Sequence, residues 1–293
     1  MKASKGRPLW GLARAKVELP LVFFYCSLFF LAGFYGSLLF SVRFSGGRVP
    51  RGRLLEVEKE VSDLPGMPHG ETGESRPSSV AFQVLSWKPR AVYFPKFATE
   101  EECRNIIKVA RPSLEPSTLA LREGETVENT KGIRTSSGTF ISASEDSTGI
   151  LDQIEQKISR VTMIPRENME SFNILRYEIG QKYASHYDVF NPAEYGPQQS
   201  NRVATFLIYL TDVEEGGETM FPYENGLNMD IGYDYEKCIG LKVKPRQGDG
   251  LLFYSMFTNH TIDPLSLHGS CPVIKGEKWV ATKWIRDQIQ DNM

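Results

Sequence analysis

The chain has 293 residues, of which 41% are hydrophobic, and its formal net charge at pH 7 is −2. This length allows one large domain or two small ones, and the apolar content is enough for a sizeable core. Because the chain has almost no net charge, it has no global basic field, and nucleic acid is not expected as a partner.

The N-terminus combines a basic segment with an uncharged one. Residues 1–18 hold five Lys or Arg residues against the single acid Glu18, and residues 19–42 carry no charge. This run is long enough to cross a bilayer with some tilt and is longer than the apolar region of a cleaved signal peptide. The sequence therefore predicts a cytoplasmic tail over residues 1–18 and one transmembrane anchor over residues 19–42. Basic residues also lie after the run, so charge gives only a weak preference for this orientation.

Residues 43–80 differ in composition from the segment that follows them. They begin basic and Gly-rich, and residues 65–79 consist mainly of Pro, Gly, Ser and Glu. A segment of that composition has too little apolar surface to form a packed core. We expect a stem or linker here, and then a packed domain over residues 81–293.

Within that domain, helix signals come first and strand signals dominate afterwards. Thr99 with Glu102 three residues later forms a capping box, which predicts a helix over residues 100–110, and a second helix is expected over residues 148–161. Runs rich in aromatic and β-branched residues predict short strands over residues 84–87, 91–94, 172–177, 203–210, 217–221, 241–244, 250–255 and 278–285. This order indicates an α+β domain whose core is a jelly roll or barrel.

The last predicted strand places a lysine on an apolar face. Alternate side chains of a strand share a face, so Lys278 is grouped with Val280, Thr282 and Trp284. Lys275-Gly276-Glu277 resembles a hairpin turn, which would lay residues 268–274 antiparallel to this strand and bring His268 beside Trp284. A lysine buried on that face needs an anionic partner.

A short motif supplies the ligands of an iron site. His186-Tyr187-Asp188 together with a distant His gives two imidazoles and one carboxylate, the set that holds non-haem Fe(II) and leaves other coordination positions open. His69-Gly70-Glu71 has the same spacing, but it lies in the Pro- and Gly-rich segment, which has no strand pattern. His186 comes after the strand-like residues 172–177 instead, so we favour it as the ligand.

The second imidazole can come from His260 or from His268. Ten residues after His268 lies Lys278, a cation suited to anchoring a dicarboxylate cosubstrate, whereas ten residues after His260 lies Ser270. Spacing therefore favours His268 modestly. Together with Lys278, the motif predicts an iron oxygenase that depends on 2-oxoglutarate.

Four blocks of the sequence resemble the prolyl 4-hydroxylases, above all the membrane-anchored, single-chain plant and algal kind that acts on hydroxyproline-rich cell-wall proteins. The blocks occur in the order of the family and cover residues 177–188, 202–211, 214–219, and 268–272 with 278–284. The resemblance extends over roughly residues 85–287. It implies a double-stranded β-helix, or jelly roll, with supporting N-terminal helices, preceded by a single transmembrane helix. It also implies Fe(II), 2-oxoglutarate, O2 and L-ascorbate as cofactors and cosubstrates, and hydroxylation of proline at C4 in Pro-rich peptides of polyproline II form.

The resemblance also assigns roles to individual residues. It implies catalytic and iron-binding roles for His186, Asp188 and His268, and 2-oxoglutarate binding by Lys278, Tyr177 and Thr219. The residues that match the peptide site are Arg134, Tyr187, Arg202 and Trp284, with Arg134 in a loop that closes over the peptide. The chain departs from relatives that carry His two positions after the Trp, because Arg286 stands there.

Cysteines and a sequon bear on the compartment. Cys238 and Cys271 flank the strand region, and the residues alone leave a disulfide and two unrelated buried thiols equally open. The family resemblance implies the disulfide, which requires an oxidising lumen. Asn259-His260-Thr261 is a glycosylation sequon. Together these features predict a single-pass type II protein of the endoplasmic reticulum or Golgi membrane, with its catalytic domain in the lumen and with a homo- or hetero-oligomeric state left open.

The residues leave two alternatives open. The first is a 2-oxoglutarate oxygenase of the same fold that acts on another residue, such as lysine. The second is an inactive peptide-binding jelly roll. An inactive relative is expected to have lost an iron ligand or the anchoring lysine, and this chain retains all of them.

Overall fold

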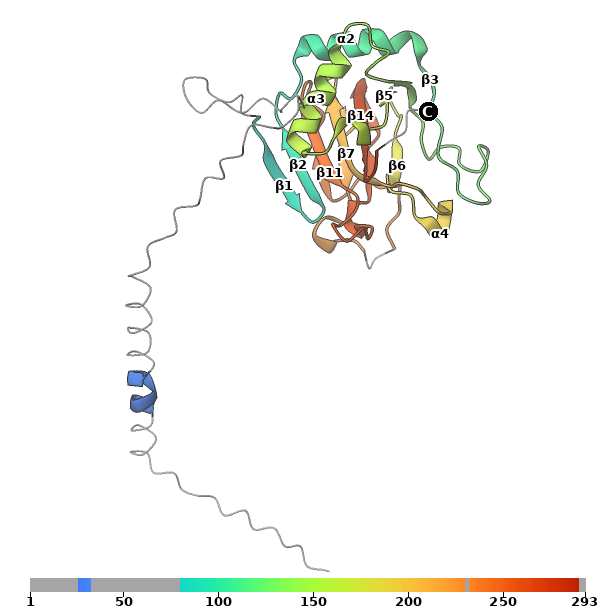
Figure 1. Ribbon diagram of the computed structural model, residues 1–293. Helices are drawn as coiled ribbons and strands as arrows, with labels where there is room; N and C mark the ends of the chain where they lie inside the picture. Colours follow the sequence, from blue (N-terminus) through green and yellow to red (C-terminus); the bar gives the residue numbers. More distant parts are fainter. Residues whose placement is uncertain (1–25, 33–79, 230–231, 290–293) are drawn as a thin grey trace, which may run out of the picture. The chain divides into compact units, whose positions relative to one another are not determined.

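The computed structural model describes residues 26–32, 80–229 and 232–289 (Figure 1). The chain divides into two compact units, Met1–His69 and Gly70–Met293. In the first unit, residues 26–32 are helical. The remainder of the predicted anchor, the predicted tail, the stem up to residue 79 and the His69 motif lie outside the described residues.

The predicted localisation requires a correction. Among the described residues, no helix has both the length and the apolar character needed to span a bilayer. This finding contradicts the predicted single-pass location in the endoplasmic reticulum or Golgi membrane. That prediction rested on the hydropathy of a run of which only a short helical part is described.

The second unit is built on a sheet of eight strands, in the order β1-β2-β11-β7-β14-β5-β4-β3. Each neighbouring pair in this sheet is antiparallel. The strands are β1 (Gln83–Trp87), β2 (Arg90–Phe94), β3 (Glu115–Pro116), β4 (Ser137–Ile141), β5 (Phe172–Tyr177), β7 (Arg202–Tyr209), β11 (Gly250–Tyr254) and β14 (Lys278–Arg286).

A smaller layer of strands completes the barrel-like core. A four-stranded sheet has the order β10-β9-β12-β6, and β13 pairs with β8. These strands are β6 (Tyr183–His186), β8 (Val213–Gly216), β9 (Thr219–Phe221), β10 (Leu241–Val243), β12 (His268–Ser270) and β13 (Val273–Gly276). The two antiparallel layers are consistent with a jelly roll.

Two long helices cover one face of the large sheet (Figure 1), and the short helices lie in the connections between strands. The longer ones are α2 (Glu100–Ala110) and α3 (Ile150–Thr162), and the short ones are η1 (Arg111–Ser113), η2 (Arg166–Asn168), α4 (Pro192–Tyr195), η3 (Glu224–Gly226) and η4 (Pro264–Ser266). The predicted capping box is confirmed, because the Thr99 side chain accepts from the Glu102 N–H and the Glu102 side chain accepts from the Thr99 N–H. Both long helices place apolar residues such as Ile106 and Ile154 in a core shared with the sheet.

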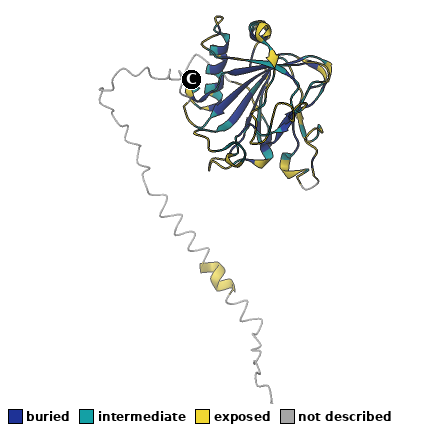
Figure 2. Ribbon diagram, turned by 90° about the vertical axis from the view of Figure 1, so that its right-hand side faces the viewer, coloured by how far each residue is buried: buried dark blue, intermediate teal, exposed yellow. Residues whose placement is uncertain are grey.

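The central strands of the large sheet are mostly buried (Figure 2), and apolar side chains form one cluster on each face. Strand β14 shows this most clearly. Trp279 and Ile285 pack into the cluster under the helices, whereas Val280 packs into the cluster on the other face. The alternation predicted for this strand is therefore confirmed, and it separates a structural face from the face that carries Lys278.

One predicted pairing is wrong. Residues 268–274 do not lie against the last strand, because β13 pairs with β8, and β12 pairs with β6 and β9. Strand β14 instead lies between β5 and β7. The short segment Lys275-Gly276-Glu277 turns the chain from the small layer into the large sheet, so neighbours in sequence enter different layers.

Candidate active site

Strand pairing brings the two imidazoles together. His186 ends β6 and His268 begins β12, and the two residues are paired in register across the antiparallel ladder. Asp188 lies two residues after His186, where the chain leaves the strand. Ligand atoms of all three side chains lie within 4.8 Å of one another, so the predicted triad assembles at one point.

Backbone carbonyls fix the orientation of both rings. His186 Nδ1 lies 2.9 Å from the carbonyl oxygen of Ala184, and His268 Nδ1 lies 2.9 Å from that of Ser266. A carbonyl oxygen can only accept, so each Nδ1 carries the donated proton and each Nε2 is the ring nitrogen left for a metal. Both Nε2 atoms face Asp188, at 3.6 Å for His186 and 3.4 Å for His268.

The charges of the triad suit a divalent cation. Burial opposes the ionisation of Asp188, but the adjacent His268 and His186 outweigh it and hold its pKa below the ordinary value. Burial also lowers the pKa of His268 to about 4, against the opposing effect of Asp188. The Thr205 hydroxyl donates to Asp188 Oδ2 at 2.5 Å, which orients the carboxylate. An ionised carboxylate and neutral imidazoles form the donor set of non-haem Fe(II), so the residues fit that metal.

A narrow pocket of about 50 Å³ leads from the triad to Lys278. Lys278 is 2% exposed, and its Nζ donates to Ser270 Oγ at 2.9 Å. Among the described residues, no carboxylate forms an ion pair with it. Burial lowers the pKa of Lys278 to about 7, with Glu218 opposing the shift. A buried ammonium beside a metal-binding triad is placed to receive the distal carboxylate of a dicarboxylate ligand.

Two hydroxyl groups line the same pocket. Tyr177 is 2% exposed and its ring lies 5.3 Å from Lys278 Nζ. Thr219 Oγ1 accepts a hydrogen bond of 2.8 Å from the buried Tyr209 hydroxyl, which leaves the proton of Thr219 available to another acceptor. Tyr209 and Ser270 thus orient the groups at this pocket. No sequence signal singled out these two residues, because their role depends on which strands lie beside β7 and β12.

Outside the triad lies a groove of about 1090 Å³ whose lining includes Arg134, Tyr187, Arg202 and Trp284. The Arg202 guanidinium lies 3.6 Å from the centre of the Trp284 ring. Glu170 accepts hydrogen bonds of 2.7 and 2.8 Å from Arg202 and one of 2.6 Å from Arg286. Arg286, at the position where some relatives are expected to carry His, is therefore part of the support that holds Arg202 against Trp284.

The other predicted groove residues lie around His186. The Tyr183 ring stacks on His186 with a centroid separation of 3.7 Å, and the Arg134 guanidinium lies 4.8 Å from the Tyr183 centroid. The Tyr187 hydroxyl donates to the Pro264 carbonyl at 2.9 Å. Tyr183 was not assigned a role from the sequence, although it belongs to the strand that carries His186.

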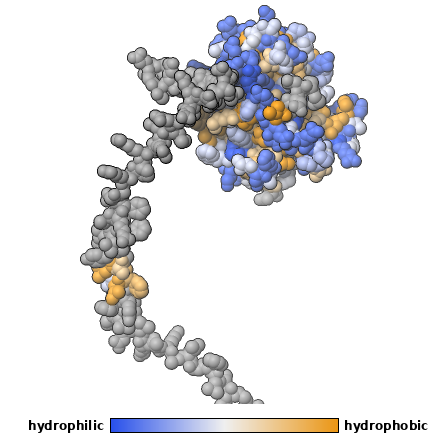
Figure 3. All heavy atoms as spheres, viewed as in Figure 1, coloured by the Kyte–Doolittle hydropathy of each residue, from blue (hydrophilic) through white to orange (hydrophobic). Residues whose placement is uncertain are grey.

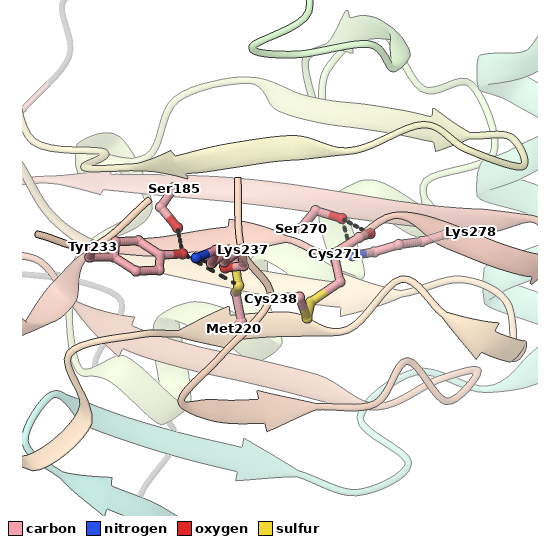
Figure 4. The surroundings of a disulfide bond; sticks show 8 residues. All are labelled: Ser185, Met220, Tyr233, Lys237, Cys238, Ser270, Cys271 and Lys278. Atoms are coloured by element: carbon pink, nitrogen blue, oxygen red, sulfur yellow. Dashed lines mark hydrogen bonds between the residues drawn. A yellow bond between two sulfur atoms is a disulfide. The ribbon is translucent and has the colours of Figure 1, made fainter. Parts of the chain in front are cut away.

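A disulfide lies next to the lysine pocket (Figure 4). It joins Cys238 to Cys271, whose Cα atoms are 5.5 Å apart, and Cys271 directly follows Ser270, the acceptor for Lys278. The cross-link ties the loop after β9 to β12. Cys103 is a buried free thiol and Cys26 an exposed one.

His260 and Asn259 lie away from the triad. The His260 side chain is 72% exposed, and its Nδ1 lies 3.8 Å from Asp287. Asn259 lies in the same exposed turn, where its side chain accepts from Thr261. The view in Figure 3 shows a largely hydrophilic domain surface around scattered apolar residues.

The chain is similar in sequence and in structure to prolyl hydroxylases. A model of the 2OG-Fe(II) oxygenase superfamily matches residues 172–286. The chain is 68% identical over 279 residues to "Probable prolyl 4-hydroxylase 9" of Arabidopsis thaliana, covering 95% of this chain and 96% of the relative. It is 55% identical over 278 residues to "Prolyl 4-hydroxylase 13" of the same plant, covering 94% and 97%. A viral collagen prolyl hydroxylase of Paramecium Bursaria Chlorella virus-1, solved with 2OG, aligns with a TM-score of 0.50 at 26% identity, covering 67% of this chain and 95% of that one.

Proposed function

This chain belongs to the prolyl 4-hydroxylases, oxygenases that depend on 2-oxoglutarate and Fe(II), and we propose that its substrates are proline-rich secretory or cell-wall proteins in polyproline II form. The proposal includes residues 81–293 as the catalytic domain and a double-stranded β-helix as its core. The observation that carries the assignment of the site is the His186, Asp188 and His268 cluster beside a buried lysine.

We assign the iron to this cluster and 2-oxoglutarate to the narrow pocket. The imidazoles of His186 and His268 and the carboxylate of Asp188 would hold Fe(II) through two Nε2 atoms and a carboxylate oxygen. When bound, iron, 2-oxoglutarate and O2 would together supply the oxidising power, and 2-oxoglutarate would be converted to succinate and CO2. Ascorbate is the reductant expected of this family.

The chain's own groups position the cosubstrate. Lys278 supplies a charge for the distal carboxylate, and the available proton of Thr219 supplies a second donor. Tyr177 closes the pocket beside them. The pocket lining is largely buried, so water is kept from the reacting groups and the charged hydrogen bonds are strengthened.

The groove supports a proline-rich substrate. A polyproline chain offers backbone carbonyls but no backbone N–H groups, so a matching groove must supply donors. The indole N–H of Trp284 is buried and has no hydrogen-bond partner among the described residues. Arg134, Tyr187 and Arg202 add a guanidinium, an aromatic ring and a second guanidinium along the same lining. Polyproline II peptides are already ordered, so binding costs little conformational entropy.

The test is product analysis with the full chain. Peptides with Ser-Pro-Pro-Pro-Pro repeats are incubated with the protein, Fe(II), 2-oxoglutarate and ascorbate, and the products are fragmented in a mass spectrometer. We expect proline residues to gain the mass of one oxygen atom, with 4-hydroxyproline after hydrolysis, and no change of free proline. An Asp188→Ala variant is the control. Oxygen incorporated into lysine of a matched peptide, with none in proline, would overturn the substrate assignment.

A further inference from the structure

Strands β5 and β14 form a ladder of side chains that leads from the narrow pocket to the groove. Their pairing sets Lys278 opposite Tyr177, Val280 opposite Leu175 and Thr282 opposite Asn173. The first two pairs and Thr282 line the narrow pocket, and the second pair is apolar. Asn173 and Trp284 both line the groove. Because alternate residues of a strand share a face, Asn173 is the next pocket-side residue of β5 after Leu175.

Asn173 is unusual among the buried polar residues. It is 2% exposed, and its Nδ2 has no hydrogen-bond partner among the described residues. Burying an amide without a partner costs about 1–3 kcal/mol, so such groups normally find one. The Trp284 indole N–H, from the adjacent strand, has no partner either within the described part of the chain. Two buried donors without partners therefore line the same groove.

We propose that Asn173 is a specificity-determining residue whose side-chain N–H donates to a backbone carbonyl of the bound proline-rich chain. This carbonyl lies next to the one that accepts from the Trp284 indole N–H. This inference rests on the proposed function and deepens it. A polyproline backbone has acceptors only, so it satisfies both groups. The backbone N–H groups of a segment without proline would gain no partner from these two donors.

Asn173 and Lys278 lie at different levels of the same two strands. Along these strands, the apolar pair Leu175 and Val280 lies between Lys278 and Asn173. The contacts proposed for the charged cosubstrate and for the neutral peptide are therefore separated by one apolar pair. An amide at the third level adds a hydrogen bond for the peptide without a charge that would compete with Lys278 for 2-oxoglutarate.

The experiment compares Asn173→Leu with the parent full-length protein. Leucine has the same number and branching of side-chain heavy atoms but no donor, so the peptide Kd and KM are expected to rise about 3-fold to 10-fold, the loss of one neutral hydrogen bond. The KM for 2-oxoglutarate is the internal reference and should move far less. The Tm is expected to stay or rise, because an unpartnered buried amide has been removed.

Ser255→Ala is the matched control. The Ser255 hydroxyl is also buried without a partner among the described residues, but the residue does not line the groove. Its removal should change neither peptide Kd nor KM. Asn173→Gln restores an amide and should recover part of the affinity lost in Asn173→Leu.

Peptide binding is measured by fluorescence anisotropy with a labelled oligoproline as well as by turnover. If the parent protein binds the oligoproline but hydroxylates no proline, the proposed function fails while the Asn173 contact is still measured. An unchanged peptide Kd in Asn173→Leu overturns the inference. So does a lowered Tm with equal losses in both KM values, because that pattern shows a structural role.

Discussion

The narrow pocket and the groove meet at His186 but are built on different principles. The pocket is small, about 50 Å³, and its lining includes the buried Lys278 as well as the triad. The groove is much larger, about 1090 Å³, and its polar groups are either held by neighbouring side chains, as Arg202 is by Glu170, or left without partners among the described residues, as the Trp284 indole N–H is. A single strong contact therefore selects the small dicarboxylate, whereas several weaker contacts select an extended chain. Substitutions in each region should separate these two kinds of recognition.

The largest effect is expected at the point shared by both regions. Replacing His186, Asp188 or His268 with Ala removes one of three protein ligands, so we expect turnover to fall below detection. The fold should survive, since these side chains lie at strand ends. Turnover and near-UV circular dichroism are the measurements, and metal content gives a readout independent of activity.

His260→Ala is the matched control for the histidine variants. His260 is the other candidate imidazole in the sequence, and its side chain is 72% exposed. We expect wild-type turnover and iron content. Substantial activity in His186→Ala, or a loss of iron in His260→Ala, would contradict the assignment of the triad.

The second effect belongs to the narrow pocket alone. A charged hydrogen bond to a carboxylate contributes about 1.5–3 kcal/mol, so Lys278→Ala should raise the KM for 2-oxoglutarate about 10-fold to 150-fold. The KM for peptide should change little, because Lys278 does not line the groove. Steady-state kinetics with each substrate varied in turn measure the difference.

Lys278→Arg sharpens this test. The guanidinium keeps the charge but not the geometry of the ammonium, so only part of the 2-oxoglutarate affinity should return. If 2-oxoglutarate binds Lys278→Ala as tightly as it binds the parent protein, another cation holds the distal carboxylate.

A pH dependence is expected from the burial of Lys278. Its pKa is lowered to about 7, so the free enzyme loses the ammonium above that pH. Bound carboxylate favours the ammonium, and the complex then holds more protons than the free enzyme. The affinity for 2-oxoglutarate should therefore fall as pH rises above about 7, with the KM increasing by up to about 10-fold per pH unit.

The comparison for this prediction is again Lys278→Arg, whose charge persists at every pH in the range. The rise in KM should disappear in that variant. The pKa of His268, lowered to about 4, places that ligand's titration below the range. A KM for 2-oxoglutarate that stays flat from pH 6 to about pH 9 in the parent protein would show that Lys278 is charged throughout.

The sequence predicted the parts of this site that depend on local pattern. The capping box at Thr99, the alternation along β14 and the placement of Lys278 on the pocket face are all set by neighbours within a few residues, and the structure confirms them. The triad residues were chosen from spacing and family resemblance. Their convergence depends on the pairing of β6 with β12, strands only a few residues long.

Long-range pairing could not be predicted from the sequence. The expected hairpin at Lys275 failed because β13 pairs with β8, and nothing local distinguishes the two outcomes. Tyr209 and Asn173 were missed for a related reason. In the sequence, each looks like an ordinary strand residue. Tyr209 has a polar role because Thr219 accepts its hydrogen bond, and Asn173 has one because its side-chain amide has no partner among the described residues.

The smallest effect is expected in the groove, from Trp284→Phe. The variant keeps an aromatic ring against Arg202 but removes the indole N–H, which has no partner among the described residues. Peptide KM should rise about 3-fold to 10-fold, with little change in Tm or in the KM for 2-oxoglutarate. Trp279→Phe is the control, because its indole N–H is also buried without a partner in the described part of the chain but faces the core under the helices. If both variants raise peptide KM equally, the effect comes from altered packing of β14. A rise confined to Trp284→Phe shows that the groove selects its chain through donors that only the substrate satisfies.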